Sequence, residues 1–204
     1  MSTSQTSMIS VQNLVRDYGP IRALSDVSFL IERGQVVGLL GPNGAGKTTC
    51  MKILTGFIAA TSGQVLIDGK DIVEHGVEVR KRIGYLPENL VLYDNLSALE
   101  TMRFFAKLKG ADQASCPALL EQVGLADVGK RAVHEFSKGM RQRLGFAQAL
   151  LGKPDVLFLD EPSNGLDPMA IREFYAHLRD LREQGVTIVI TSHILADLQE
   201  RVDR

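Results

Sequence analysis

Four short runs of the chain are rich in Val, Ile and Leu and are apolar almost throughout, without alternation between apolar and polar positions. Continuous apolar runs of four or five residues are typical of strands that are buried on both faces, as in a parallel sheet covered by helices. The pattern therefore predicts an α/β fold with a mostly parallel central sheet. The four runs are Val36–Leu40, Ile83–Leu86, Val156–Leu159 and Thr187–Ile190.

Three other segments mix apolar and polar positions and are separated by turn residues. They are Ile9–Tyr18, Leu24–Glu32 and Gln64–Asp68. Mixed patterns of this kind indicate half-exposed strands. We expect these three strands to form a smaller antiparallel region beside the parallel core.

Residues 97–151 are predicted to be mostly helical. Ser97 and Glu100 are spaced as a capping box, in which the two side chains satisfy free N–H groups at a helix start. Asp167 and Pro168 are a favourable N-cap and first residue of a later helix. Apolar positions every three or four residues support two of these helices. They are Met140, Leu144, Ala147 and Leu151, and then Ile171, Phe174, Leu178 and Leu181.

Length allows one large domain or two small ones, and the composition, with 45% apolar and 23% charged residues, is ordinary for a globular protein. We expect a single domain over residues 1–204. We expect the β region and core over about 1–95 and 152–204, and a helical subdomain over about 96–151. The formal net charge of −1 argues against nucleic acid or an anionic membrane as the main partner. Two cysteines, Cys50 and Cys116, are too few for a disulfide framework and indicate free thiols in a reducing compartment.

The chain shows no segment that would insert it into a membrane. The first ten residues are polar and rich in Ser and Thr, unlike a secretory signal. The apolar runs, such as Val36–Leu40, are far shorter than the roughly 20 residues that span a bilayer. If the protein serves a membrane process, another chain must cross the membrane.

A phosphate-binding motif directly follows the run Val36–Leu40. The motif G-x-x-x-x-G-K-[ST] lets a glycine-rich backbone wrap closely around an anion at the start of a helix. The lysine reaches the β- and γ-phosphates, and the hydroxyl of the last motif residue binds Mg²⁺. A chance glycine-rich turn is the alternative, and the strand before and helix formers after it argue against that. The residues expected to bind nucleotide here are Gly41, Pro42, Asn43, Gly44, Ala45, Gly46, Lys47, Thr48 and Thr49.

Two acids, Asp160 and Glu161, follow the run Val156–Leu159. The carboxyl ends of parallel strands are where α/β folds place their chemistry. Asp160 is suited to holding Mg²⁺, and Glu161 to orienting and deprotonating an attacking water. The alternatives are a helix-capping role for Asp160 and a solvated loop position for Glu161. With the phosphate-binding motif alone, kinase, GTPase and ATPase all remain open.

From about Ile9 to its last residue, the chain resembles the nucleotide-binding subunit of ATP-binding cassette (ABC) transporters. The segment Phe136–Met140 stands where that family has its Leu-Ser-Gly-Gly-Gln signature, and it is followed by Arg-Gln-Arg-Leu. Ser137 is a strong N-cap candidate, and with Gly139 and the helix dipole it makes a second anion site. The resemblance implies that this site binds the γ-phosphate held by an opposite subunit. For the segment taken alone, an ordinary capped helix is the alternative.

The resemblance assigns further roles one residue at a time. Tyr18 matches the aromatic residue that stacks on adenine, and the segment 163–167 matches a loop that touches the partner subunit. His193 matches a histidine that contacts the γ-phosphate. Glu88 stands where most members have a glutamine that acts near the metal. A surface tyrosine and a structural histidine are the respective alternatives for Tyr18 and His193.

The sequence departs from the family pattern at three places. Lys138 replaces the first glycine of the signature and Met140 replaces its glutamine, whereas Gly139 is kept. Glu88 adds a negative charge beside the expected Mg²⁺. The changes at positions 138 and 140 put the strength of the contact with the opposite subunit in question.

The resemblance implies an ATPase that uses ATP and Mg²⁺, forms a dimer of cassettes, most simply a homodimer, and couples hydrolysis to transport. It would act peripherally at the cytoplasmic face of the inner (plasma) membrane, together with an integral membrane subunit and without nucleic acid. In the family the docking groove for that subunit lies near Glu88 and the helical region. Apolar candidates for it are Leu90, Val91, Leu92, Tyr93, Phe104 and Phe105.

Two other classes compete with a transporter ATPase. A soluble ABC ATPase of DNA repair would carry a long coiled coil between Glu88 and Ser137, where only 49 positions separate them. A translation-type member usually carries two cassettes, and this chain holds one. A P-loop kinase or GTPase leaves the Ser137 segment unexplained, and no guanine-reading Asn-Lys-x-Asp motif is present.

The segments around Glu88 and Ser137 look like the type-2 exporter branch. Residues Arg103–Ala111 and Leu119–Leu125 are similar to the ATPase subunit that supports copper-site assembly of nitrous oxide reductase. Gliding-motility and multidrug ATPases share much of this pattern. Family cassettes also continue beyond the helix predicted over Ile194–Val202, so we expect a cassette that is truncated at its C-terminus.

Overall fold

The computed structural model describes residues 7–193 and 202–203. In these residues the strands are β1 (Ile9–Tyr18), β2 (Ile21–Ile31), β3 (Val36–Leu40), β4 (Ser62–Ile67), β5 (Lys70–Asp71), β6 (Ile83–Leu86), β7 (Val156–Asp160) and β8 (Thr187–Ser192). The α-helices are α1 (Lys47–Leu54), α2 (Gly76–Lys81), α3 (Ala98–Lys109), α4 (Cys116–Gln122), α5 (Lys138–Ala149) and α6 (Pro168–Glu183). The helix predicted over Ile194–Val202 lies outside the described residues, apart from Val202.

The parallel sheet predicted from the four apolar runs is confirmed. Its strand order is β3-β8-β7-β6, and all three neighbouring pairs are parallel. Successive residues of β7 face two different cores, with Leu157 and Leu159 on the side of the helical region and Val156 and Phe158 on the side of α1. Every position is therefore buried, which explains why the runs are continuous. Fully burying one such side chain stabilises the fold by about 1.5–3 kcal/mol.

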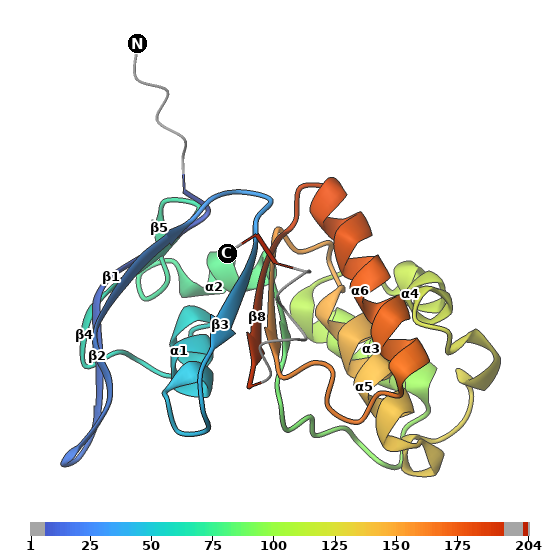
Figure 1. The fold of residues 1–204 in the computed structure, drawn as a ribbon. Helices are drawn as coiled ribbons and strands as arrows, with labels where there is room; N and C mark the ends of the chain where they lie inside the picture. The colour runs from blue at the N-terminus through green and yellow to red at the C-terminus, as the bar shows by residue number, and fades with distance from the viewer. Residues whose placement is uncertain (1–6, 194–201, 204) are drawn as a thin grey trace.

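The smaller antiparallel sheet is also confirmed, with strand order β2-β1-β4-β5. Strand β2 begins at Ile21 and β4 at Ser62, slightly earlier than predicted. Figure 1 shows α1 and α2 between this sheet and the parallel sheet, whereas α3, α4, α5 and α6 cover the opposite face of the parallel sheet. Two short elements, β5 and α2, were not predicted, because two and six residues are too few to show a periodicity.

The helical region predicted over residues 97–151 contains α3, α4, α5 and three short 3₁₀ turns. The capping box before α3 is present: Ser97 Oγ accepts from Glu100 N at 3.3 Å, and Glu100 Oε2 accepts from Ser97 N at 2.8 Å. Ser137 caps α5, since its Oγ accepts from Met140 N at 3.2 Å. No helix of the described residues has both the length and the apolar character needed to cross a bilayer.

An ion-pair network joins the antiparallel sheet to the edge of the parallel sheet. The Arg82 guanidinium, just before β6, donates to both Asp68 and Asp155 at 2.6 Å. Arg33 pairs with Asp68 as well. The hydrogen bond from Arg82 is the main reason that the pKa of Asp68 lies below its ordinary value. The network fixes the relative position of the two sheets that flank α1.

Candidate functional site

Four neighbouring strands of the parallel sheet each lead into one part of the predicted site. The phosphate-binding loop follows β3, His193 follows β8, the acids Asp160 and Glu161 stand at the end of β7, and Glu88 follows β6. Carboxyl ends of parallel strands meet at one edge of a sheet. The fold therefore gathers residues that lie as much as 150 positions apart in the sequence.

The loop between β3 and α1 folds around the side chain of Lys47. The Lys47 ammonium donates to the carbonyl oxygens of Gly41 at 2.7 Å and of Pro42 at 3.1 Å, and Ala45 N donates to Pro42 O. The N-terminus of α1 has no side-chain cap and no acidic residue in its first turn. Its positive dipole end is therefore left for an anion.

Glycine is needed at two positions of the loop for different physical reasons. Gly46 has φ +90°, and a Cβ there would lie 2.6 Å from the carbonyl oxygen of Ala23 on β2. Gly44 has φ +85°, but a Cβ there would meet open space. Gly46 is therefore required by packing against β2, whereas Gly44 leaves room for a ligand to approach the backbone.

Six of the nine predicted residues of the phosphate-binding loop line one cavity of about 270 Å³, here called the P-loop cavity, whereas Gly41, Pro42 and Ala45 do not. Acids from two other strands, Glu88 and Glu161, face the same space as the loop. Ala23 was not predicted, and nothing in its sequence surroundings marks it as a lining residue. The lining residues are Ala23, Asn43, Gly44, Gly46, Lys47, Thr48, Thr49, Glu88 and Glu161.

Thr191 is a site residue that the sequence reasoning missed. Its buried hydroxyl donates to Asp160 Oδ1 at 2.6 Å and accepts from Glu161 N at 2.9 Å. Thr191 lies directly opposite Asp160 in the β7–β8 register. The sequence signal that could have identified Thr191 is its position two residues before His193, which follows a predicted core strand. The other carboxylate oxygen, Asp160 Oδ2, is buried and has no hydrogen-bond partner among the described residues.

Glu161 is held in an unusual position by its neighbours. Its φ is +50°, a left-handed conformation that costs a residue with a side chain about 1 kcal/mol or more. The residue is only 6% exposed, and its Oε2 lies 2.8 Å from His193 Nδ1. The histidine side chain is 44% exposed, so it lies between the buried carboxylate and the solvent.

Tyr18 lies at the end of β1, and it is not one of the residues that line the P-loop cavity. Its ring is 45% exposed, and the Arg16 guanidinium carbon lies 4.5 Å from the ring centroid. This cation–π contact covers one face of the ring. A flat ligand therefore has the other face available.

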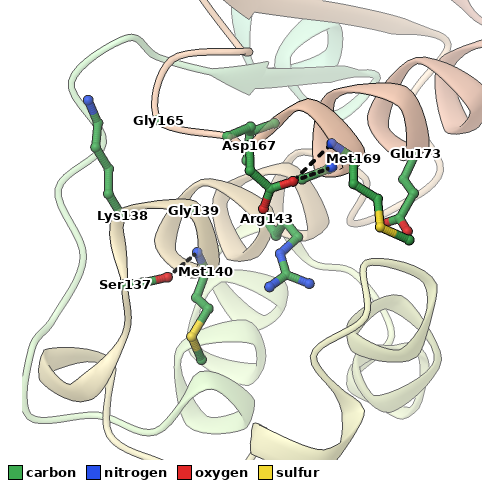
Figure 2. A pocket seen from close by; sticks show the side chains of 11 residues that line it. Ser137, Lys138, Gly139, Met140, Arg143, Gly165, Asp167, Met169 and Glu173 are labelled. Atoms are coloured by element: carbon green, nitrogen blue, oxygen red, sulfur yellow. Dashed lines mark hydrogen bonds between the residues drawn. The ribbon is translucent and has the colours of Figure 1, made fainter.

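A second cavity of about 420 Å³ surrounds the start of α5, and we call it the Ser137 cavity (Figure 2). Ser137 and Gly139 line it from α5, whereas Gly165 and Asp167 line it from the segment before α6. Asp167 caps α6, since its Oδ1 accepts from the backbone N of Met169 and Ala170 at 2.9 Å. Two helix N-termini thus border one cavity.

The two segments around this cavity are closely packed. A Cβ on Gly139 would lie 3.3 Å from Gly165 O, and one on Gly165 would lie 2.6 Å from Lys138 Cδ. Figure 2 shows the Lys138 side chain extending away from Ser137, whereas Arg143 extends into the cavity. The lysine that departs from the family signature therefore packs along Gly165, and Gly139 packs against the carbonyl oxygen of the same residue.

The six apolar residues predicted for a docking groove divide into three groups. Leu90, Val91 and Phe105 line a common groove of about 660 Å³, whereas Leu92 is buried in the core. The other two residues, Tyr93 and Phe104, pack edge to face with ring centroids 5.2 Å apart and do not line that groove. Sequence reasoning could not separate them, because all six lie in apolar surroundings.

A strand, a glycine-rich phosphate-binding loop and a helix, with acids at the end of a neighbouring parallel strand, define a P-loop nucleoside-triphosphatase core. Comparison with known proteins assigns the chain to a family within this class. Residues 24–164 match the family described as "ABC transporter". The chain belongs to the ABC transporter family and is an ATP-binding, ATP-hydrolysing subunit of such a transporter.

Individual relatives agree with this assignment. The chain is 41% identical over 196 residues to the lantibiotic transport ATP-binding protein SrtF of Streptococcus pyogenes, covering 96% of this chain and 84% of SrtF. It is 38% identical to the probable multidrug ABC transporter ATP-binding protein YbhF of Escherichia coli, covering 99% of this chain and 36% of YbhF. A solved ATP-binding subunit of an ABC transporter superposes with a TM-score of 0.89 at 32% identity, covering 97% of this chain and 84% of that one.

Proposed function

We propose that two copies of this chain close on two ATP molecules, so that each ATP lies between the P-loop cavity of one copy and the Ser137 cavity of the other. The observation that carries the proposal is that the two cavities of one chain share no lining residue. Each offers a helix N-terminus, which attracts phosphate. Neither cavity alone supplies groups on both sides of a triphosphate, so a single copy would hydrolyse ATP poorly.

In this proposal the Lys47 ammonium binds the β- and γ-phosphates in place of the two loop carbonyls it now contacts. Glu161 accepts a proton from the attacking water, and His193 holds the Glu161 carboxylate in position through their 2.8 Å contact. Tyr18 stacks on adenine with the ring face that Arg16 leaves open. Ser137 and Gly139 N–H from the other copy contact the γ-phosphate.

The residues also fit a bound Mg²⁺. Asp160 Oδ2 is a buried oxygen without a partner among the described residues, and Thr48 and Glu88 bring further oxygen atoms to the P-loop cavity. Mg²⁺ prefers such oxygen ligands. When bound, it would offset negative charge on the phosphates. Thr48, Glu88 and Asp160 would hold it.

We further propose that the chain serves a type-2 exporter as a peripheral subunit at the cytoplasmic face of the plasma membrane. The names of SrtF and YbhF, a lantibiotic and a probable multidrug transporter, support export. The integral membrane subunit would dock in the 660 Å³ groove lined by Leu90, Val91 and Phe105.

A second candidate is export linked to copper-site maturation. It rests on the similarity of residues 103–111 and 119–125 to the ATPase subunit of that system, and both segments belong to the helical region. Deletion of the gene separates the two candidates. Loss of copper from nitrous oxide reductase would favour the second, whereas greater sensitivity to a peptide antibiotic would favour the first.

Mixing two inactive variants tests the composite site. Lys47→Ala damages the P-loop cavity, and Gly139→Asp places a negative charge in the Ser137 cavity. Each variant alone should be inactive. In an equal mixture, half of the dimers carry one intact composite site, so about a quarter of the wild-type ATPase activity should return. Zero activity in the mixture, with both variants folded, would contradict the proposal.

Glu161→Gln tests the proton acceptor. The variant should bind ATP and form a dimer that size-exclusion chromatography resolves, while turnover falls by about 100- to 10,000-fold. Glu183→Gln, at the exposed end of α6, is a matched control and should hydrolyse ATP normally. Wild-type turnover by the Glu161 variant would show that another group accepts the proton.

A further inference from the structure

Arg16, on β1, is a half-buried cation whose position no ion pair explains. It forms no salt bridge with another residue in the described part of the chain. The adjacent acid, Asp17, pairs with Arg22 on β2, at 2.8 Å. The Arg16 Nε atom is buried and has no hydrogen-bond partner among the described residues. Taking a guanidinium out of water without a carboxylate is unfavourable, so the position of Arg16 needs another explanation.

The Arg16 guanidinium contacts an aromatic ring and a carbonyl oxygen. Its carbon lies 4.5 Å from the centroid of the Tyr18 ring, and its Nη1 donates to Ala59 O at 3.1 Å. Arg16 and Tyr18 are alternate residues of one strand, and alternate side chains of a strand lie on the same face. The guanidinium therefore joins the ring to a backbone atom that lies 43 positions away in the sequence.

The carbonyl oxygen that holds Arg16 is itself fixed relative to β1. Ala59 and Thr61 belong to the segment between α1 and β4. Thr61 N donates to Val15 O at 2.8 Å, and Thr61 Oγ1 accepts from Asp17 N at 2.9 Å. These two hydrogen bonds lie on either side of Arg16 along β1. The same segment leaves α1, the helix that begins in the phosphate-binding loop, so the ring and the loop are connected through one short helix.

Tyr18 occupies a place where its ring would otherwise be free to turn. It is the last residue of β1, and the two turn residues Gly19 and Pro20 separate it from β2. The residue is 45% exposed. An exposed side chain samples several rotamers, and fixing it when a ligand binds costs conformational entropy. A ring that the guanidinium already holds has lost this freedom before the ligand arrives.

We propose that Arg16 is a positioning residue for the base of the nucleotide: its guanidinium covers one face of the Tyr18 ring and holds the ring in place, so that adenine stacks on the other face. The proposal rests on the proposed stacking of Tyr18 on adenine and adds a residue that acts only through that ring. Arg16 contacts no phosphate in this arrangement. Its contribution to affinity should therefore be confined to the base.

A double-mutant cycle on the full chain tests this coupling. Calorimetry measures the binding of ADP, which the protein does not turn over. Tyr18→Ala should weaken ADP binding about ten- to thirtyfold, as expected for one stacked base. Arg16→Met removes the cation over the ring and should weaken binding about three- to tenfold. In the Tyr18→Ala background, Arg16→Met should change the affinity by less than about twofold, because the ring through which it acts is gone.

Inorganic pyrophosphate separates positioning of the base from a merely structural role. Pyrophosphate offers the loop the same two phosphates without a base, so Arg16→Met should leave its affinity unchanged. If Arg16 served only to tie β1 to the segment after α1, its loss would weaken ADP and pyrophosphate alike. That loss would also persist without the Tyr18 ring. Arg16→Gln, which keeps a neutral N–H donor, is a second variant and should give the same selective loss of ADP affinity.

Arg22→Met is the matched control. Arg22 is an exposed arginine of the neighbouring strand, and its recorded partner is the Asp17 carboxylate, not the Tyr18 ring. The variant removes one positive charge close to Arg16 but leaves the cation–π contact in place. Its ADP affinity should stay within about twofold of the wild type. An equal loss in Arg22→Met and Arg16→Met would show that the net charge of this region matters and would overturn the positioning role.

Two further results would overturn the proposal. They are an unchanged ADP affinity in Arg16→Met, and an equal loss of ADP affinity with and without the Tyr18 ring. Either result, together with weaker ADP binding by Tyr18→Ala, would leave the proposed stacking on adenine intact. Unchanged ADP binding by Tyr18→Ala would instead remove the stacking and the role of Arg16 with it. The mixing experiment with Lys47→Ala and Gly139→Asp does not involve Tyr18, so it tests the composite site separately.

Discussion

Thr191→Val should lower the free energy of unfolding by an unusually large amount for an isosteric change, because one buried hydroxyl forms hydrogen bonds with two adjacent site residues. The change removes the hydrogen bond to Asp160 Oδ1, and Asp160 Oδ2 already lacks a partner among the described residues. It also leaves Glu161 N without its acceptor in a buried position. A hydrogen bond to a charged group contributes about 1.5–3 kcal/mol, and a buried N–H without a partner costs about 1–3 kcal/mol.

Together these losses predict a decrease of about 3–5 kcal/mol in the free energy of unfolding. That is a large share of the 5–15 kcal/mol typical of a domain. In urea, with a slope of about 2–3 kcal/mol per molar, the unfolding midpoint should fall by about 1–2.5 M. Circular dichroism at 222 nm during a urea titration measures this shift without nucleotide.

Thr187→Val is the matched control on the same strand. Thr187 is also fully buried, and in the described part of the chain its hydroxyl oxygen accepts from the neutral Gly34 N, and not from a charged group, at 2.9 Å. Its loss should cost about 1 kcal/mol and shift the midpoint by less than half a molar. Thr191→Ser keeps the hydroxyl and should recover most of the loss. Equal midpoints for the two valine variants, or a serine variant as unstable as Thr191→Val, would refute this reasoning.

Lys47→Ala should weaken ATP binding by about ten- to a hundredfold in isothermal titration calorimetry, since charge-assisted hydrogen bonds are lost; an equal loss in Lys52→Ala, at an exposed position of the same helix, would contradict this. Ser137→Ala removes the N-cap of α5 and should cost about 1 kcal/mol, or 2–4 °C in melting temperature by calorimetry. The folded chain loses the Lys109 proton near pH 8, whereas the unfolded chain keeps it to about pH 10.4. Between pH 8 and 10 the unfolded state therefore binds more protons than the folded state. The free energy of unfolding of the wild type, relative to that of Lys109→Met, should rise in this range by up to about 1.4 kcal/mol per pH unit, as measured by urea unfolding. A difference between the two proteins that does not change with pH would contradict the burial of the Lys109 cation.

The parallel sheet could be predicted from the sequence because both faces of its strands are buried. Every residue of β7 and β8 is buried, so a continuous apolar run in the sequence marks most of each strand. Only the strand ends were missed: Asp160, Thr191 and Ser192 are polar residues that still belong to the strands. The hydrogen-bonded ladder continues through these polar residues, and the candidate site is built on the last residues of these strands.

The helix caps were predictable for a different reason. The Ser97 and Glu100 side chains bond within four residues, so the whole interaction is visible in a short stretch of sequence. The contact between Thr191 and Asp160 spans 31 positions and depends on the register of two strands. No local pattern encodes that register. Thr191 therefore became visible as a site residue only in the folded chain.

The groove of about 660 Å³ beside β6 was likewise only partly predictable, because it also depends on contacts between residues far apart in the sequence. Lys109 lies 26 positions from Ile83, its hydrogen-bond partner, and its sequence surroundings are those of an ordinary amphipathic helix end. Its partial burial depends on the fold, which brings the end of α3 close to Ile83 at the start of β6. Three of the six predicted apolar residues, Leu90, Val91 and Phe105, line the groove, and its positive charge was not predicted.

The order of the parallel strands has a consequence for synthesis of the protein. In the sheet β8 lies between β3 and β7, although it is the last of the four strands in the chain. Within the described residues, strand β3, which leads into the phosphate-binding loop, has β8 as its single neighbour in that sheet. The loop therefore cannot be fixed beside the acids of β7 while the ribosome is still making the residues before Thr187. A nascent cassette therefore cannot bring its phosphate-binding loop beside the acids of β7 until β8 has been made.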